Sequence, residues 1–177
     1  MIETSRLRLR LHEATDFQAL QQMWGDPRVT RFIGGEPNPP NEVWRRLMFY
    51  RGHWQLLGFG FWIVEERTSR SFVGELGFAN FERGLHETDG VREAGWCLSP
   101  DHFGRGFATE AMHAATDWLT TTFGPQRTVC IIHPENTPSI ALAHRLGYEK
   151  FGVVDFKGIA DVFERTLDYK PSHRTLS

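Results

Sequence analysis

The chain has 177 residues, of which 40% are hydrophobic and 13% aromatic, and its formal net charge at pH 7 is −2. This length is typical of one globular domain with a substantial core, and the near-neutral charge argues against a protein that wraps nucleic acid. No apolar run approaches the roughly 20 residues that a membrane span needs, and the two cysteines, Cys97 and Cys130, lack the paired spacing of a zinc site. We therefore expect a single domain over residues 1–177 in the reducing cytoplasm, with no metal, no nucleic-acid partner and no membrane partner.

Hydrophobic periodicity predicts strands and helices along almost the whole chain. Leu7, Leu9 and Leu11 alternate with arginines, which is the pattern of a half-buried strand, whereas apolar residues after Asn41 recur at the three- and four-residue spacing of a helix. The predicted elements, in chain order, are a strand over residues 2–11, a helix over 16–24 capped by Thr15 and ended by Gly25-Asp26-Pro27, a loop over 34–40, a helix over 41–57, strands over 60–65, 72–80 and 92–98, a helix over 108–123, a strand over 128–132, a helix from Pro138 to Gly147 capped by Thr137, strands over 149–156 and 162–168, and a polar tail from Lys170.

Residues 99–111 combine the end of a strand, a glycine-containing loop and the start of a helix. Gly104 and Gly106 allow backbone N–H groups to turn toward a ligand, and the first turn of the following helix adds unpaired donors and its dipole. The segment lacks the Gly-Lys-Ser/Thr of a Walker loop and the third glycine of the dinucleotide fingerprint. It predicts a site for the pyrophosphate of another cofactor; a helix entry with flexible glycines is the alternative.

Five motifs occur in a fixed order along the chain. They are Glu3–Arg10, Arg31–Gly35, Glu93–Pro100, Gly104–Ala111, and Asn136–Ser139 followed by Leu146–Tyr148. Together they resemble the GNAT superfamily of acetyl-CoA-dependent N-acetyltransferases, and within it the RimJ/RimL-type branch of ribosomal-protein N-terminal acetyltransferases. The resemblance covers residues 2–168 and implies an α/β (α+β) fold: a single mixed, mostly antiparallel sheet of six to seven strands, flanked by four helices and splayed between its fourth and fifth strands.

The resemblance also implies a set of contacts with acetyl-CoA. The pyrophosphate would face the backbone N–H groups of Gly104, Arg105, Gly106, Phe107, Ala108 and Thr109, with an added ion pair from Arg105; backbone groups of Cys97 and Leu98 would hold the pantetheine and the thioester; Asn136 would bind the pantetheine amides and Ser139 would offer a proton to the sulfur. Asn136 and Ser139 are also residue types that cap helices, so a purely structural role remains open for both. The chain departs from the family at Phe103, where Gln or Arg is usual, and at Ala143, where many members carry a tyrosine acid.

Transfer to an amine requires that a proton be removed, because an α-amine or a lysine is largely protonated at pH 7. Glu93 stands where the family has its strand glutamate and is the first candidate base. Glu75 on the neighbouring strand is the second candidate, and a water relay is the third.

The acceptor is the least determined part of the interpretation. The resemblance implies a protein N-terminus or a small-molecule amine, acidic residues over 82–93 would attract a cationic amine, and Trp44, Phe49 and His53 are candidates for an acceptor groove. Two alternatives remain: a non-catalytic acyl-CoA-binding or sensing module, and an acyltransferase that uses a longer acyl-CoA. We expect a monomer or a homodimer.

Overall fold

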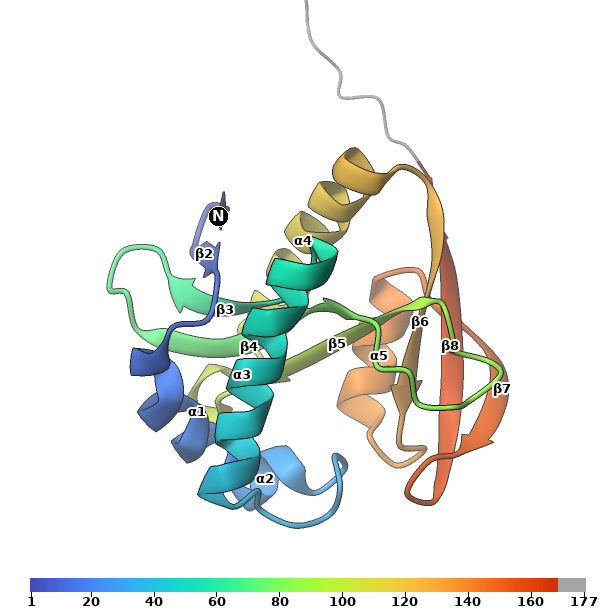
Figure 1. The fold of residues 1–177 in the computed structure, drawn as a ribbon, viewed down its shortest axis with the longest axis horizontal. Helices are drawn as coiled ribbons and strands as arrows, with labels where there is room; N and C mark the ends of the chain where they lie inside the picture. The colour runs from blue at the N-terminus through green and yellow to red at the C-terminus, as the bar shows by residue number, and fades with distance from the viewer. Residues whose placement is uncertain (169–177) are drawn as a thin grey trace, which may run out of the picture.

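The computed structural model describes residues 1–168, which form one eight-stranded sheet and five α-helices (Figure 1). The tail predicted from Lys170 lies outside the described residues. The elements are β1 (Ile2–Glu3), β2 (Leu7–Arg10), η1 (Ala14–Asp16), α1 (Phe17–Trp24), α2 (Pro27–Thr30), α3 (Pro40–Leu57), β3 (Phe61–Glu66), β4 (Phe72–Ala79), β5 (Arg92–Leu98), η2 (Pro100–His102), α4 (Phe107–Phe123), β6 (Gln126–Ile132), α5 (Thr137–Arg145), β7 (Glu149–Asp155) and β8 (Ile159–Leu167).

The sheet opens between β5 and β6. The strand order is β1-β2-β3-β4-β5-β6-β8-β7, and neighbouring strands are antiparallel except β5 and β6, which are parallel. These two strands pair only at Arg92 with Thr128 and at Glu93 with Val129, and then diverge. The predicted splay is confirmed, and it leaves the inner edge of β5 beyond Glu93 free of a strand partner in the described chain.

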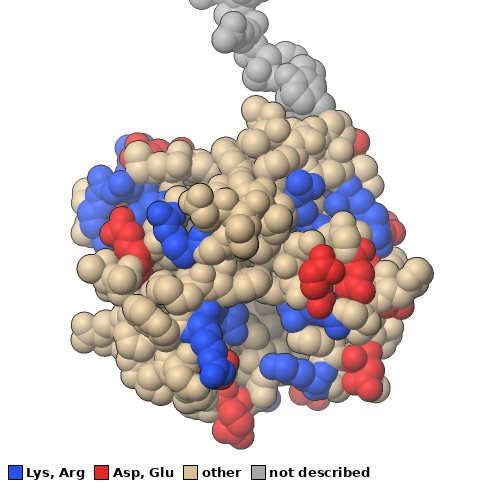
Figure 2. Space-filling view, viewed as in Figure 1, with Lys and Arg blue, Asp and Glu red and all other residues tan. Residues whose placement is uncertain are grey.

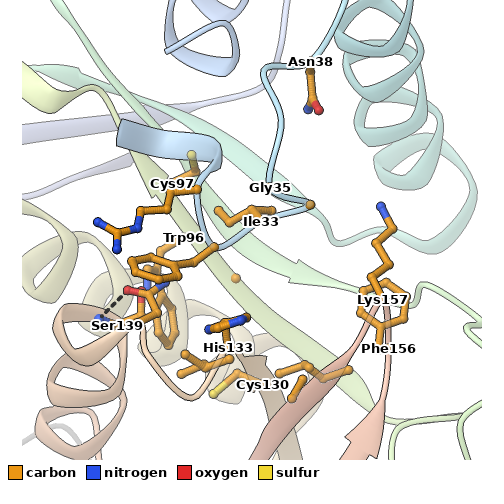
Figure 3. A pocket seen from close by; sticks show the side chains of 18 of the residues that line it. Ile33, Gly35, Asn38, Trp96, Cys97, Cys130, His133, Ser139, Phe156 and Lys157 are labelled. Carbon is orange, nitrogen blue, oxygen red and sulfur yellow. Dashed lines mark hydrogen bonds between the residues drawn. The ribbon is translucent and has the colours of Figure 1, made fainter. Parts of the chain in front are cut away.

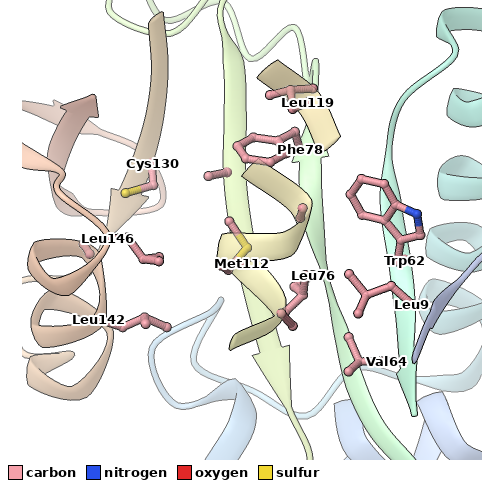
Figure 4. Close-up of a cluster of buried hydrophobic side chains, with 14 of the residues drawn as sticks. Leu9, Trp62, Val64, Leu76, Phe78, Met112, Leu119, Cys130, Leu142 and Leu146 are labelled. Carbon is pink, nitrogen blue, oxygen red and sulfur yellow. The ribbon is translucent and has the colours of Figure 1, made fainter. Parts of the chain in front are cut away.

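Helices cover both faces of the sheet. One core joins β2, β3, β4 and β5 to α4 and α5, and Figure 4 shows Met112 and Leu119 of α4 against Leu76 and Phe78 of β4. A second core joins the other face to α1, α2 and α3, through residues such as Leu47. The apolar stripe predicted for α4 therefore packs on the sheet, and this fixes the start of α4 beside the end of β5. No helix within residues 1–168 has both the length and the apolarity to cross a bilayer, and Cys97 and Cys130 are buried free thiols.

Three local predictions are wrong; the first of them accounts for the extra strand, and α2, which was not predicted, is the extra helix. The first predicted strand is a hairpin, because the N–H of Thr4 donates to the carbonyl of Leu7 (2.9 Å) and folds β1 back on β2. Thr15 does not cap α1, since it lies inside the 3₁₀ turn η1, which begins after Glu13. Thr137 is the first residue of α5, and Asn136 caps that helix by accepting from the N–H of Ser139 (3.3 Å).

Candidate active site

The glycine loop leaves six consecutive N–H groups without an acceptor. Gly104 (φ +73°) and Gly106 (φ +76°) are both left-handed, and Gly106 is the N-cap of α4. The first bond of the helix runs from the N–H of Glu110 to the carbonyl of Gly106 (3.1 Å), and within residues 1–168 no acceptor bonds the N–H groups of residues 104–109. A Cβ built on Gly104 would meet no atom within 4 Å. A pyrophosphate therefore fits this loop, which has both the donors and the open space for it.

The N-terminal hairpin holds the glycine loop in place through Glu110. This carboxylate accepts from the hydroxyls of Thr4 (2.5 Å) and Ser5 (3.0 Å), and from the backbone N–H (3.0 Å) and Nε (2.6 Å) of Arg6. Arg6 also donates to the carbonyl of Arg105 (3.0 Å). The carboxylate of Glu110 thus anchors the first turn of α4 to a segment about 100 residues earlier in the chain.

We expect Glu110→Gln to lower the free energy of unfolding by about 1–2 kcal/mol at pH 7, because it weakens charge-assisted hydrogen bonds to a partly buried carboxylate. Burial opposes ionisation of Glu110, but the bonds from Thr4, Arg6 and Ser5 outweigh it and lower its pKa. A lowered pKa contributes stability at neutral pH that is lost as the pH falls through the folded-state pKa. The gap between wild type and variant, measured by urea unfolding, should therefore close toward pH 3. Asp117→Asn, on the exposed side of the same helix, is the control, and a gap independent of pH would contradict the assignment.

The ion pair predicted from Arg105 to a phosphate is not preformed. Its guanidinium lies 2.8 Å from the carboxylate of Glu66 on β3 and 4.4 Å from the ring centroid of Phe107. The backbone of residues 104–109 therefore supplies the donors of the loop in this structure.

A cavity of about 690 Å³ occupies the opening between β5 and β6. This volume is within the range of small-molecule sites. In Figure 3, Trp96 and Ser139 lie on one side of the cavity, and Phe156 and Lys157 lie on the opposite side. The cavity is thus bounded by β5 and α5 at one end and by the β7–β8 turn at the other.

Ser139 and Asn136 line the cavity at the start of α5. The indole N–H of Trp96 donates to the hydroxyl oxygen of Ser139 (3.2 Å), so the hydroxyl proton remains free for another acceptor. Asn136 uses its Oδ1 as the cap of α5 and keeps its amide N–H groups for a ligand. Both residues therefore combine a structural role with an unused hydrogen-bond donor, so a role in capping α5 and a role in binding a ligand are compatible.

Glu93 lines the cavity but already has a partner. Its oxygens accept from Nε (2.8 Å) and Nη2 (2.9 Å) of Arg83, and the glutamate is only 7% exposed. Arg83 is in turn placed between two rings, 4.3 Å from the centroid of Phe81 and 4.2 Å from that of Phe156. The register of β5 with β4 contains no bulge, so Glu93 and Cys97 share a face of the sheet, as the parity of the sequence requires.

Glu75, the second candidate base, does not line the cavity. It is fully buried, and its oxygens accept from the indole N–H of Trp24 (2.9 Å) and contact Nε2 of His12 (2.8 Å). Glu93 therefore borders the cavity directly, whereas Glu75 would need a water relay to reach an amine there.

Cys97 lines the cavity and Leu98 does not, and their side chains are buried on opposite faces of the sheet. Several other residues discussed above lie away from the cavity. Ala143 is fully buried in the core and is not a cavity residue, so a tyrosine here would meet core side chains. Trp44, Phe49 and His53 do not line the cavity; His53 is buried, with Nδ1 bonded to the carbonyl of Phe59 (2.7 Å).

Sequence reasoning missed the basic side chains of the cavity. They are Arg31, Arg46, Arg83 and Lys157. They come from four separate segments, and no spacing in the sequence links them. Of the acidic residues over 82–93, Glu93 alone lines the cavity, so the predicted attraction of this stretch for a cationic amine has no counterpart in the other acids.

Comparison with known proteins gives a consistent result. The family model described as an acetyltransferase (GNAT) domain matches residues 6–149. The uncharacterised N-acetyltransferase p20 of Bacillus licheniformis is 32% identical over 153 residues, which is 85% of this chain and 83% of that protein. A GnaT-family acetyltransferase from Bordetella pertussis superposes with a TM-score of 0.82 at 32% identity, covering 93% of this chain and 98% of that one. RimL, a ribosomal L7/L12 alpha-N-protein acetyltransferase solved with coenzyme A, has a TM-score of 0.76 at 16% identity, over 93% of this chain and 96% of its own, which is a likeness of fold.

Proposed function

The chain belongs to the GNAT acetyltransferase family and is an N-acetyltransferase, and from that premise we propose that it moves the acetyl group of acetyl-CoA directly to a primary amine. The observation that carries the proposal is the row of unpaired N–H groups at residues 104–109, next to a sheet that opens beyond Glu93. The first feature suits the pyrophosphate, and the second leaves room for the pantetheine and thioester. The complex of RimL with coenzyme A supports the same cofactor for this fold.

The proposed reaction is an addition and elimination at the thioester carbonyl. The amine nitrogen attacks the carbonyl carbon, the C–S bond breaks, and the thiolate leaves as coenzyme A. Backbone N–H groups of β5 near Cys97 polarise the carbonyl, and Glu93 takes the proton that the amine loses. Most of the rate comes from holding the amine against the thioester.

Protonation of the departing thiolate is assigned to Ser139. Its hydroxyl proton is free because Trp96 already donates to the oxygen, and the first turn of α5 adds a positive dipole end that favours the thiolate. A thiolate is a good leaving group. The Ser139 hydroxyl and the N-terminus of α5 can therefore replace the tyrosine acid that many family members carry where this chain has Ala143.

A covalent acyl-enzyme on cysteine is not part of the proposal. Cys97 and Cys130 both border the cavity, but burial raises the pKa of each thiol above its ordinary value. The nucleophile would have to be the thiolate, which burial disfavours. Direct transfer avoids this cost.

The proposal predicts that the protein releases thiol from acetyl-CoA only when an amine is present. The measurement is thiol release with a reporter dye across ribosomal-protein N-terminal peptides, amino acids, polyamines and aminoglycosides, together with mass spectrometry of the acceptor. A thermal-shift ranking of acetyl-, propionyl- and succinyl-CoA identifies the acyl chain. Tight binding of acetyl-CoA with no release for any amine would refute catalysis, and a preference for succinyl-CoA would refute acetyl transfer.

A further inference from the structure

The cavity is positively charged although the chain as a whole is negative. Four cationic side chains line it, Arg31, Arg46, Arg83 and Lys157, against two carboxylates, Glu36 and Glu93. The net charge of the chain is −2. Figure 2 shows Lys and Arg side chains gathered around the hollow in this face of the molecule. The excess of positive charge is therefore a local property of the cavity.

Three of these cations have no carboxylate partner. Within residues 1–168, ion pairs at 4.0 Å or less involve Arg83 but not Arg31, Arg46 or Lys157. Arg46 lies over the ring of Trp24 (3.9 Å to the centroid), and its Nε is buried without a hydrogen-bond partner. A cation that is partly desolvated and unpaired favours a ligand that brings a negative charge.

Lys157 is held at the mouth of the cavity in an unusual backbone conformation. It lies in the turn between β7 and β8 with φ +55°, a left-handed value that is uncommon for a lysine. A Cβ built on Gly34, in the loop that carries Arg31, would be 3.9 Å from its Nζ. The ammonium of Lys157 therefore reaches across to the loop on the other side of the opening.

Arg83 and Glu93 form an ion pair, and a small molecule that carries both a positive and a negative group could contact both residues. Arg83 uses Nε and Nη2 for Glu93 and leaves Nη1 for another acceptor. The aromatic rings of Phe81 and Phe156 enclose the guanidinium on two sides. A ligand with adjacent positive and negative groups would meet Glu93 with the first and Arg83 with the second.

We propose that the acceptor is an α-amino acid, or an equally small amine with a carboxylate beside its amino group, whose carboxylate is bound by Arg83 and Lys157. The inference rests on the proposed function and narrows it. The ammonium lies toward Glu93, which takes its proton, and the carboxylate lies toward Nη1 of Arg83 and the ammonium of Lys157. The phosphates of acetyl-CoA do not account for these cations, because none of residues 104–109 lines the cavity. A polyamine would place positive charge against positive charge.

The test compares each amino acid with its own carboxamide as acceptor. Phenylalanine, methionine and glutamate are each paired with the corresponding α-amide, and spermidine and an N-terminal peptide are added. The amide has the less basic and therefore more available amine, so intrinsic reactivity favours it. We expect kcat/KM to be at least about tenfold higher for one or more amino acids than for the matching amide, since the amide loses a charge-assisted contact.

A pair of variants locates the contact. Lys157→Met is expected to raise the KM for the amino acid about tenfold, with kcat and the KM for acetyl-CoA little changed. Lys150→Met is the matched control, because Lys150 lies on the same hairpin but outside the cavity and is paired with Asp161 (2.6 Å). This variant should leave both KM values unchanged.

A protein that acetylates amides, peptides or spermidine as well as amino acids would overturn the inference while the proposed function stands. An increase in the KM for acetyl-CoA alone in Lys157→Met would also overturn it, whereas thiol release with no amine at all would refute the proposed function itself.

Discussion

Gly104→Asp is expected to weaken binding of acetyl-CoA about a hundredfold, whereas Gly104→Asn should weaken it less than about tenfold. Both side chains tolerate the left-handed backbone that residue 104 adopts, and a Cβ there meets no atom within 4 Å. The two variants therefore differ only in charge. A carboxylate about 5 Å from one phosphate charge, at an effective dielectric constant near 20, costs about 3 kcal/mol.

Calorimetric titration of acetyl-CoA into the two variants and the wild type measures this difference. Thermal unfolding without ligand is the control, and it should show the same midpoint for both variants to within a few degrees. Equal affinities for the two variants would mean that no phosphate lies at this loop. Raising the salt concentration should reduce the difference between them, because the site is partly exposed to solvent.

Glu93→Gln is expected to lower kcat about a hundredfold while the KM for acetyl-CoA is nearly unchanged, which is the usual size of a general-base contribution. The glutamine keeps the shape of the side chain and one acceptor for Arg83, but it cannot take a proton. Since Glu93 is buried and the ion pair is lost, the free energy of unfolding should be measured as well, to separate loss of activity from loss of folded protein.

Arg83→Met tests whether Glu93 acts as the base or only holds Arg83 in position. If Glu93 is the base, Arg83→Met leaves the carboxylate in place and acts mainly on the KM for the acceptor, whereas Glu93→Gln acts on kcat. The pH–rate profile should change in Glu93→Gln, whose side chain cannot take a proton. Equal losses of kcat in the two variants, or an unaltered pH–rate profile in Glu93→Gln, would count against Glu93 as the base.

Local sequence patterns predict most of the helices and strands correctly. The strand β5 has the predicted bounds, and α3, α4, β4 and β8 differ by a few residues at their ends. Such elements depend on the periodic burial of apolar side chains, and this period can be seen in consecutive residues of the sequence. The hairpin at Thr4 is the exception, because the alternation of leucine and arginine begins only at Arg6 and the two residues of β1, Ile2 and Glu3, are too few to show a period of their own.

The glycine loop that we propose for the cofactor could be predicted from the sequence because all its parts lie within about ten residues. Two glycines, a helix start and the end of a strand are local features, and the geometry of a helix start by itself leaves four N–H groups unpaired. Its attachment through Glu110 to the hairpin at Arg6 could not be recognised, since the two segments are about 100 residues apart and meet only when the sheet forms.

The chain alone therefore determined the kind of protein, an N-acetyltransferase fold with an open strand pair, and the local glycine loop that we propose for the pyrophosphate. Only the tertiary structure decided which charged side chains surround the cavity that we propose for the acceptor. Arg83 becomes the partner of Glu93, and Arg31, Arg46 and Lys157 gather around one cavity, because folding brings together segments that share no spacing. The electrostatic potential in a cavity depends on the distances to all the charged groups around it. Those distances are set by the fold, and the sequence alone does not give them.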